Sequence, residues 1–576
     1  MKRGAQRILF RCDGGRMPEI GTGHIRRCAQ LADYHRRQYG SEVRVVVRDY
    51  PGAIELLQTR GISASDIELI DPHLSETQVM ERVLESFEPH VCVFDLLEVD
   101  VEAVRCCQRA GVVTVTLDDV GAALATADIA VNAIREHAAT CYSGPDYLVL
   151  PDDATKPSAS QEGPGPRLSL LVSTGGYDPG HLAARVVSAV RALPAVKRIR
   201  VVAADAEAAT KCHMLAGRND DGMLNVVHSV PELGSFLAQS DLAIVSGGLT
   251  LFEAMRRGVP SIVVAQSGHQ ADTARRYAAR GAVVAIGEAG DDFEQRVQAA
   301  VAELVSAPVK REQLSRAARR LVDGGGLKRV ANLIRMCEPL EWDTQFFGRR
   351  IADIKPLRLT ERIMDYVLAR CREWGIECLY YQSDCHHAPS VQLAEQHGFH
   401  FVDIRLTFER YVSKQMAAGP SQRPAGVEIR ECRPQDMPAL KEIASDSYLD
   451  SRYYFDARFP RERCAAFYTE WIEKCANGLV DRVLVAERGS QPVGYVACRR
   501  VSPFVGSLDL VGVHSRDRQR GIGRALVEAA LSWCAVEGME RVQVVTQGRN
   551  HPSQRLYQRC GFLTKHTRLW YHKWFD

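Results

Sequence analysis

The stretch with the clearest chemical character lies near the C-terminus, where glycines and arginines stand at a predicted helix start. "RQRGIG" (518–523) follows the apolar run "LDLVGV" (508–513) and precedes an amphipathic pattern. Backbone amides at a helix N-terminus bind anions, aided by about half a positive charge from the helix dipole. Glycine allows a close approach to a pyrophosphate, and arginine adds cationic donors. The pattern therefore indicates a pyrophosphate site, although an ordinary strand–turn–helix junction would show the same glycines.

A second predicted helix follows in "NHPSQRLYQRCGF" (550–562). Together with the glycine turn, it resembles the GNAT superfamily of N-acetyltransferases. The resemblance implies that the strand before the turn splays from its neighbour, so that the thioester of acetyl-CoA lies between them. It also implies that Tyr557 protonates the leaving thiolate, whereas a purely structural core tyrosine is the alternative. The implied acetyl-CoA-binding residues are Val511, Val513, Arg518, Arg520, Gly521, Gly523 and Asn550.

Several separated segments extend this resemblance over about residues 337–576. "CEPLEWDTQFFG", "DMPALKEIASDSYLDSRYYFDARFPRERC" and "VTQGRNHPSQRLYQRCGF" together resemble the dTDP-fucosamine acetyltransferases. Those enzymes acetylate the 4-amine of a nucleotide-linked 4-amino-4,6-dideoxy sugar, which implies a similar acceptor here. The aromatic and charged loop "SRYYFDARFP" (451–460) is expected to contact that acceptor, with surface packing as the alternative. "LAEQHGFHFVD" (393–403) and "LYQRCGFLTKH" (556–566) share a helix–Gly-Phe–strand pattern and hint at two related half-modules.

Near the N-terminus, a histidine stands at the start of another predicted helix. The apolar run "RILFRCD" (7–13) leads to "EIGTGHIRRC" (19–28), in which His24 follows two glycines. The positive end of a helix favours the neutral imidazole, which can accept a proton from water. The pattern thus predicts a general base at a cleft, although a lone histidine at a helix start is more often a cap or a surface residue.

A third glycine-bearing helix start occurs in "SGGLTLFE" (246–253). Its amides are suited to a nucleotide diphosphate, and Glu253, one turn into the helix, is expected to bond ribose hydroxyls. An ordinary glycine cap is the alternative for this segment.

Taken in order, these segments resemble the pseudaminic-acid pathway UDP-sugar hydrolases, which have a two-domain GT-B fold. The resemblance covers roughly residues 7–335 and includes "LDDVG" (117–121) and "LLVSTGGYDPG" (170–180). One departure is Leu97, which stands where those hydrolases usually carry a tyrosine. The resemblance implies His24 as the catalytic residue. The implied nucleotide-sugar-binding residues are Asp13, Gly21, Gly23, Gly176, Val230, Gly247, Gly248, Thr250, Glu253 and Gln270.

The elements that must position these residues follow from the alternation of apolar strands and helical patterns. Fully apolar runs between helices are typical of parallel sheets covered on both faces. The Pro/Gly-rich stretch 156–166 separates two such groups, and 413–426 is predicted to be a flexible linker. We therefore expect an α/β fold with a GT-B-like pair of Rossmann-type domains followed by a GNAT fold with an N-terminal half-module. The expected domains are 1–160, 166–335, 337–412 (the half-module) and 427–576 (the GNAT domain).

Length and composition limit the classes of partner. The chain has 576 residues, 46% of them hydrophobic and 25% charged, with a net charge of +2. This balance gives no indication of a nucleic-acid or membrane partner, and it leaves the oligomeric state open. The 17 cysteines show no zinc-type spacing, so no metal is predicted. Free thiols and the lack of a signal-like N-terminus favour the cytoplasm.

The sequence thus predicts a bifunctional enzyme of nonulosonic (pseudaminic) acid biosynthesis. The C-terminal half is expected to N-acetylate the 4-amine of a UDP-4-amino-4,6-dideoxy-N-acetylhexosamine, with acetyl-CoA as co-substrate. The N-terminal half is expected to hydrolyse the resulting UDP-sugar with inversion, releasing UDP and the free sugar. Two alternatives remain: a GT-B glycosyltransferase fused to an acyltransferase, and an acetyltransferase with a non-catalytic nucleotide-sugar-binding module.

Overall fold

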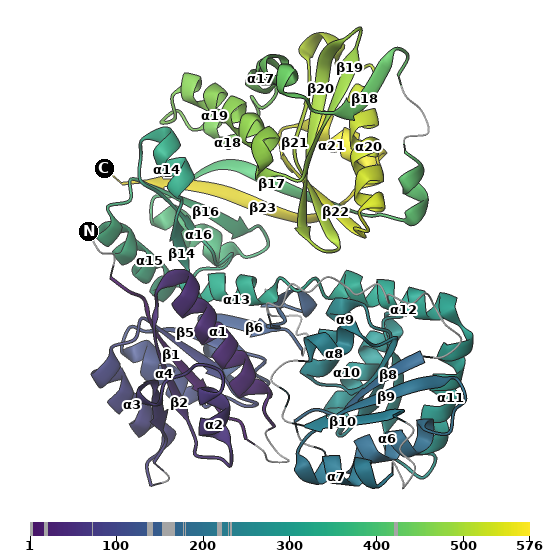
Figure 1. The fold of residues 1–576 in the computed structure, drawn as a ribbon. Coiled ribbons are helices and arrows are strands. Elements are labelled where there is room, and N and C mark those ends of the chain that lie inside the picture. Colours follow the sequence, from purple (N-terminus) through teal and green to yellow (C-terminus); the bar gives the residue numbers. More distant parts are fainter. Residues whose placement is uncertain are drawn as a thin grey trace. The chain divides into compact units, whose positions relative to one another are not determined.

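The computed structural model divides the chain into two compact units, residues 2–334 and 335–576 (Figure 1). The predicted domain boundary at 156–166 lies outside the described residues. The structure describes residues 4–15, 21–71, 73–134, 142–151, 168–176, 178, 180–215, 222–228, 230, 233–419 and 424–575.

The first unit contains two parallel sheets of the same topology. Their strand orders are β3-β2-β1-β4-β5-β6-β7 and β10-β9-β8-β11-β12-β13. Both follow the 3-2-1-4-5-6 order of Rossmann-type domains, in which ligands bind beyond the carboxyl ends of the strands. The strands are β1 (Arg7–Cys12), β2 (Glu42–Val47), β3 (Ile67–Leu69), β4 (Val91–Asp95), β5 (Val113–Leu117), β6 (Ile129–Asn132), β7 (Tyr142–Ser143), β8 (Leu168–Ser173), β9 (Val196–Ala203), β10 (Leu224–His228), β11 (Leu242–Ser246), β12 (Ser261–Ala265) and β13 (Val284–Glu288).

Helices cover these sheets, which explains why their central strands are apolar throughout. Every residue of β4, β5, β11 and β12 is buried, as expected for strands with both faces covered. The predicted strands therefore occur where the apolar runs placed them. The helices of this unit are α1 (Gly23–Tyr39), α2 (Ala53–Gln58), α3 (Glu76–Phe87), α4 (Val101–Arg109), α5 (Ala123–Thr126), α6 (Leu182–Val190), α7 (Ala206–Met214), α8 (Gly234–Ala238), α9 (Leu249–Arg257), α10 (Gly268–Ala279), α11 (Phe293–Ser306), α12 (Pro308–Leu321) and α13 (Gly326–Arg335).

The second unit is built on one ten-stranded mixed sheet. Its order is β14-β15-β16-β23-β17-β22-β21-β20-β19-β18. The strands are β14 (Cys337–Pro339), β15 (Ile351–Ile354), β16 (Cys378–Asp384), β17 (His400–Tyr411), β18 (Val427–Glu431), β19 (Arg482–Arg488), β20 (Gln491–Ser502), β21 (Val505–Val513), β22 (Arg541–Gln547) and β23 (Leu563–Trp574). The helices are α14 (Glu341–Phe347), α15 (Glu361–Trp374), α16 (Ala388–Gln396), α17 (Met437–Ser445), α18 (Arg452–Phe455), α19 (Arg461–Lys474), α20 (Ile522–Val536) and α21 (His551–Arg559).

The predicted half-module and GNAT domain share this sheet rather than forming separate domains. Strand β17, from the half-module, lies between β22 and β23 and is antiparallel to both. Strand β23 in turn pairs with β16 of the half-module. The segments β15-α15-β16-α16-β17 and β21-α20-β22-α21-β23 have the same order of elements, which agrees with the internal repeat. The last strand of each half thus pairs with a strand of the other half, β17 with β22 and β23 with β16.

Two segments singled out from the sequence have defined contacts in the fold, and the expected contact of 451–460 with the acceptor stays a prediction. Part of the linker 413–426 forms a short 3₁₀ helix (Lys414–Ala418), and the Ser532 hydroxyl of α20 donates to the Ala417 carbonyl oxygen at 3.1 Å; residues 420–423 lie outside the described residues. In the loop 451–460, Tyr453 and Phe459 are buried in the core beneath α19. Aromatic packing against the half-module therefore accounts for much of this loop.

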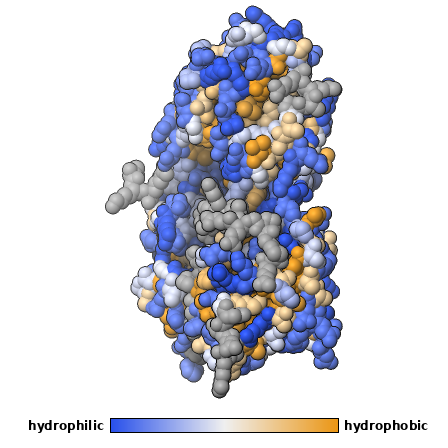
Figure 2. Space-filling view, turned by 45° about the vertical axis from the view of Figure 1, so that its right-hand side comes forward, coloured by the Kyte–Doolittle hydropathy of each residue, from blue (hydrophilic) through white to orange (hydrophobic). Residues whose placement is uncertain are grey.

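One face of the molecule is mostly polar. Figure 2 shows one face on which hydrophilic residues predominate and hydrophobic residues occur in small groups. Every described cysteine is a free thiol, and most are buried. Within the described part of the chain, no helix has both the length and the apolar character needed to cross a bilayer.

The position of β17 leads to a prediction about fragments. A fragment of residues 335–576 should fold and melt cooperatively, because it retains every strand of the sheet. A fragment of residues 427–576 should not, because β22 and β23 lose the strand between them and expose unpaired edges. Circular dichroism during a thermal melt distinguishes the two. A cooperative melt of the shorter fragment would show that β17 is dispensable.

Candidate functional site

The first candidate site lies at the carboxyl ends of the strands in the first sheet. His24, in the first turn of α1, has its Nδ1 atom 2.6 Å from Oδ1 of Asp95, the last residue of β4. Asp95 is fully buried, whereas the His24 side chain remains 18% exposed. The carboxylate therefore fixes the imidazole by accepting the Nδ1 proton, which leaves Nε2 as the proton acceptor. The helix start and a specific carboxylate, rather than the helix start alone, orient the predicted base.

A buried arginine holds this carboxylate in place. The guanidinium of Arg27 is hydrogen-bonded to both oxygens of Asp95 and to Asp118, and all three side chains are nearly inaccessible. Burial by itself would raise the pKa of Asp95, but Arg27 and then His24 hold that pKa below its usual value. Asp118 adopts a φ of 52°, and its other oxygen accepts from the Ile134 amide at 2.8 Å. The network keeps Asp95 ionised beside His24.

The start of α1 meets the start of α9 across the first unit. A Cβ built on Gly23 would lie 3.8 Å from Leu249 Cδ1, and one on Gly176 would lie 2.7 Å from Thr22 Oγ1. Gly248 precedes α9 without a side-chain cap, so the amides of the first turn face outward. The structure thus brings the predicted Gly23, Gly176 and Gly248 to one junction.

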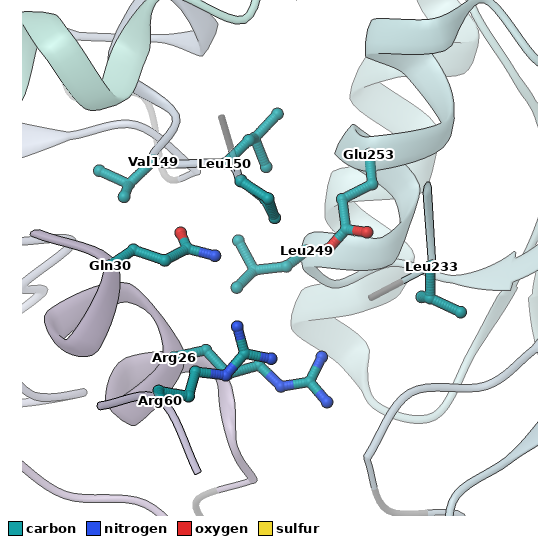
Figure 3. Close-up of a pocket in the computed structure, with 9 residues that line it drawn as sticks. Arg26, Gln30, Arg60, Val149, Leu150, Leu233, Leu249 and Glu253 are labelled. Carbon is teal, nitrogen blue, oxygen red and sulfur yellow. The ribbon is translucent and has the colours of Figure 1, made fainter. Parts of the chain in front are cut away.

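A pocket beside this junction is lined by helices and connecting segments of both Rossmann-type domains (Figure 3). Arg26 and Arg60 lie side by side, and Glu253 of α9 lies on the other side with Leu249 and Leu233. Thr250, one turn before Glu253 in α9, is buried. Glu253 lines this pocket, and its expected contact with a ribose stays a prediction, whereas Arg26 and Arg60 were not singled out from the sequence.

Other predicted residues are engaged within the fold. Both Asp13 oxygens accept from Arg11, at 2.6 and 2.9 Å, in a buried ion-pair network. Gln270 accepts from the Gln266 amide at 3.0 Å, and a Cβ on Gly247 would lie 2.6 Å from the Gln270 carbonyl oxygen. These contacts give the residues structural roles, and ligand contacts by them stay predictions.

Two predicted positions remain in this unit, Gly21 and Val230, together with the departure at Leu97. Gly21 has a φ of 64°, which suits glycine at the turn before α1. Val230 is half-buried against the core that includes α9. Leu97, where a tyrosine was expected, is 49% exposed. Its side chain therefore contributes no buried contact to the network around His24.

The second candidate site lies where two parallel strands separate. β21 and β22 pair only from Val505 to Leu508, whereas β21 stays paired with β20 as far as Val513. On the other side, β22 stays paired with β17 as far as Gln547. A gap therefore opens between the ends of β21 and β22, with Val511 and Val513 on one edge. This is the splay that the resemblance implied.

The glycine turn forms the start of α20 beside this gap. Gly521 has a φ of 80° and precedes α20 without a side-chain cap. A Cβ on Gly523 would lie 3.3 Å from Leu556 and 3.7 Å from Val513, so a larger residue would crowd α21 and the end of β21. The uncapped amides therefore lie next to the strand gap, where an anion can bind them.

The arginines and the asparagine near this turn have defined contacts. Arg518 donates from Nε to the Val513 carbonyl oxygen at 3.1 Å, and the Arg520 side chain is 60% exposed. Asn550 caps α21 by accepting from the Ser553 amide at 3.1 Å. Asn550 thus has a structural role as a helix cap, and its contact with a ligand stays a prediction.

Tyr557 lies in the core between α20, α21 and the sheet. It is 4% exposed, and burial raises the pKa of its hydroxyl well above the usual value. The hydroxyl therefore keeps its proton at neutral pH, as a general acid requires. Tyr448, which follows α17, lies close enough that Tyr557 contributes to raising the pKa of its hydroxyl, after burial and Tyr495. Tyr448 lies within the quoted segment "DMPALKEIASDSYLDSRYYFDARFPRERC" but was not singled out, because its proximity to Tyr557 depends on the tertiary fold.

The fold and these two sites define the class of protein. The chain combines a GT-B-like pair of Rossmann-type sheets with a C-terminal acetyltransferase domain of the GNAT type. Residues 438–562 match the model of the Acetyltransferase (GNAT) family. This region is therefore similar to the GNAT acetyltransferases, a family that uses acetyl-CoA as co-substrate.

Known proteins similar to this chain include two curated relatives. Over 337 residues it is 24% identical to spore coat polysaccharide biosynthesis protein SpsG of Bacillus subtilis, covering 56% of this chain and 96% of that protein. Over 239 residues it is 25% identical to dTDP-fucosamine acetyltransferase of Escherichia coli O6:H1, covering 41% of this chain and 97% of that protein. Among solved structures, MurG of Acinetobacter baumannii is 14% identical with a TM-score of 0.43, covering 58% of this chain and 99% of that one.

The comparisons confirm part of what the sequence predicted. The GNAT domain and the similarity to dTDP-fucosamine acetyltransferase are confirmed. The similarity to pseudaminic-acid pathway hydrolases, the roles of individual residues and the expected absence of a metal stay predictions. Asp95 and Arg27 were missed as functional residues, although an aspartate that ends a buried strand could have indicated the first.

The Arg27 network leads to a prediction about stability. Arg27→Met should destabilise the first sheet by about 3–5 kcal/mol, because two buried carboxylates lose their cation. Since the pKa of Asp95 is below its usual value, its contribution is present at neutral pH and is lost as the pH falls through that pKa. Hydrogen exchange of β1 and β4 measures the change.

A matched control uses an exposed arginine of the same unit. Arg105, whose side chain is 55% exposed and pairs with Glu102, should tolerate the same change to methionine within about 0.5 kcal/mol. Equal protection of β1 and β4 in both variants would show that the buried pairs do not stabilise the site.

Proposed function

We propose that the C-terminal half transfers the acetyl group of acetyl-CoA to the 4-amine of a UDP-4-amino-4,6-dideoxy-N-acetylhexosamine. The observation that carries this proposal is the gap between β21 and β22, which lies beside an uncapped glycine helix start. The pyrophosphate of acetyl-CoA binds the α20 amides, and its thioester enters the gap. Similarity to a relative named dTDP-fucosamine acetyltransferase supports a nucleotide-linked amino sugar as acceptor.

The chemistry of acetyl transfer assigns a role to Tyr557. The neutral amine attacks the thioester carbonyl, the nitrogen loses a proton to water, the C–S bond breaks, and the thiolate of CoA must gain a proton. Tyr557 supplies that proton, because its raised pKa keeps the hydroxyl protonated. The buried position of Tyr557 against Phe408 and Phe562 keeps water from this side of the ring.

We further propose that the N-terminal half hydrolyses the acetylated UDP-sugar. His24 Nε2 accepts a proton from water, since Asp95 holds the Nδ1 proton. The water attacks the anomeric carbon opposite the leaving group, the C–O bond to UDP breaks, and the configuration inverts. The amides of α9 hold the diphosphate, and Glu253 in the adjoining pocket bonds the ribose.

Consecutive reactions give a reason for one chain to carry both sites. The acetylated product of the first reaction is the substrate of the second, which releases UDP and a 2,4-diacetamido-2,4,6-trideoxyhexose. Such a sugar is a precursor in pseudaminic or other nonulosonic acid biosynthesis. Mass spectrometry of products from isomeric UDP-4-amino sugars, supplied with acetyl-CoA, tests the proposal and identifies the sugar.

The role of Tyr557 leads to a kinetic prediction. Tyr557→Phe should lower kcat of acetyl transfer by about 100-fold or more while the KM for acetyl-CoA changes little. Because the pKa of Tyr557 is raised, the wild-type rate should not lose its general acid below about pH 10, the usual tyrosine value. The exposed Tyr411→Phe serves as the control and should be neutral. An unchanged kcat for Tyr557→Phe would remove Tyr557 from the mechanism.

The role of His24 leads to a second kinetic prediction. His24→Gln should lower UDP release from the acetylated UDP-sugar by about 100-fold or more, because the water loses its proton acceptor. Acetylation should continue at the wild-type rate, and His73→Gln, at an exposed position, should leave both reactions unchanged. Chromatography of released UDP measures the effect.

The same assay separates the two alternatives. UDP release that requires an added acceptor would identify a glycosyltransferase. UDP-sugar binding without release, in wild type and variant alike, would identify a binding module; the exposed Leu97 is the feature that favours this reading.

A further inference from the structure

Two arginines of the acetyltransferase unit face each other across neighbouring strands. Arg405 of β17 and Arg568 of β23 are directly opposite in the antiparallel register. Residues in such positions have Cβ atoms about 4.5–5.5 Å apart, and like charges there are unfavourable. The sheet therefore places two guanidinium groups side by side, an arrangement that the fold alone does not require.

On the other side of β23, Asp384 is directly opposite Arg568, but within the described part of the chain its carboxylate pairs with Arg358, at 2.9 Å, and forms no ion pair with Arg568. Arg568 has one weak contact, from Nη1 to Gln382 Oε1 at 3.5 Å, and neither guanidinium forms an ion pair with a described residue. Burial, and then the nearby Arg568 and Arg452, lower the pKa of Arg405 to about 10, with Asp353 acting in the opposite direction. The surroundings thus disfavour the positive charge of Arg405 in the absence of an anion.

A third arginine strengthens the positive field but is itself compensated. Arg452 lies over the rings of Trp570 and Tyr380, with its guanidinium carbon 3.8 and 4.2 Å from their centroids. It also donates to the Tyr453 hydroxyl at 2.7 Å, which in turn donates to Asp343 at 3.1 Å. Arg452 therefore has a structural set of partners, whereas Arg405 and Arg568 do not.

The pair is close to the gap where the thioester enters. Arg405 is opposite Gln547 on its other side, and Gln547 is the last residue of β22, one edge of the gap. Leu406 packs into the core beneath α20 and α21, so Arg405, the adjacent residue, points to the opposite face. Trp570, two residues along β23 from Arg568, lies on that opposite face with α19. The arginine pair thus lies across the sheet from the glycine turn that starts α20.

We propose that Arg405 and Arg568 bind the diphosphate group of a nucleotide-linked acceptor sugar, which approaches the thioester from the face opposite to α20. This inference rests on the proposed acetyl transfer to a nucleotide sugar. Guanidinium groups present several donors in a planar fork that matches phosphate oxygens. A diphosphate would relieve the repulsion between the two arginines, so binding gains energy that an exposed pair of arginines would not supply. The pair would therefore select nucleotide-linked over free amino sugars.

A steady-state experiment on the full chain tests the pair. Arg405→Gln and Arg568→Gln should each raise the KM for the UDP-linked acceptor about 10–100-fold, as expected for lost charged hydrogen bonds. The kcat should stay within about threefold, and the KM for acetyl-CoA should not change. A nucleotide-free amino sugar should react equally with wild type and variants. Arg372→Gln, at an exposed position of α15, is the matched control.

A binding experiment tests the pair even if no acetylation is found. All 6 tryptophans lie between residues 342 and 574, so tryptophan fluorescence of the full chain reports on the acetyltransferase unit. Titration with inorganic pyrophosphate, in the presence of saturating acetyl-CoA, should change the emission of wild type. Either glutamine variant should weaken this binding about tenfold or more. Binding that depends on the arginines without any acetylation would support the anion site and contradict the proposed function.

Several outcomes would overturn the inference. Equal pyrophosphate binding by wild type and both variants would do so, as would a fall in kcat with an unchanged KM for the acceptor. An increased KM for acetyl-CoA would assign the arginines to coenzyme A instead. The glutamine variants should not lose thermal stability, since they remove a repulsion. If they do not fold, Arg405→Lys and Arg568→Lys keep the charge and should restore part of the pyrophosphate binding.

Discussion

The first amides of a helix have no partner within that helix, and both candidate sites depend on this constraint. In each unit a strand ends, a glycine turn follows, and a helix starts without a side-chain cap: α9 after Gly248 and α20 after Gly521. Some other helix starts carry a side-chain cap, as Ser75 does for α3 and Thr360 for α15, whereas others, such as α1 and α6, carry none. What α9 and α20 share is an uncapped start that directly follows a glycine in the turn after a strand, where a ligand can supply the missing acceptors.

The molecule contains arginines in two kinds of surroundings, some paired with carboxylates and some without an ion pair. Arg27 is enclosed by Asp95 and Asp118, so its charge is compensated and it fixes the carboxylate that orients His24. Arg405 and Arg568 are next to each other and form no ion pair with a described carboxylate, since the neighbouring Asp384 pairs with Arg358. A compensated cation stabilises the resting fold, whereas an uncompensated pair indicates a charge that arrives with a ligand.

In the second unit, the last strand of each half pairs with strands of the other half. One candidate site can therefore contain residues from both halves. Strand β17 brings Arg405 from the half-module to the edge of β22, and β23 brings Arg568 back beside it. The halves differ at the position of the proposed acid: in the aligned helices α16 and α21, Ala394 stands where the second half has Tyr557. The repeat therefore conserves the architecture, while each half supplies different chemistry to a shared sheet.

The sequence by itself determined the elements, because burial on both faces leaves a continuous apolar run and a helix start leaves a local glycine signal. It thus located β1 and β21, and the turns before α9 and α20. It could not determine that Asp95, 71 residues from His24, holds the imidazole, or that Arg405 faces Arg568. Those pairings depend on strand order and register between distant segments, which local periodicity does not encode. The tertiary structure alone decided them, together with the insertion of β17 that joins two predicted domains into one sheet.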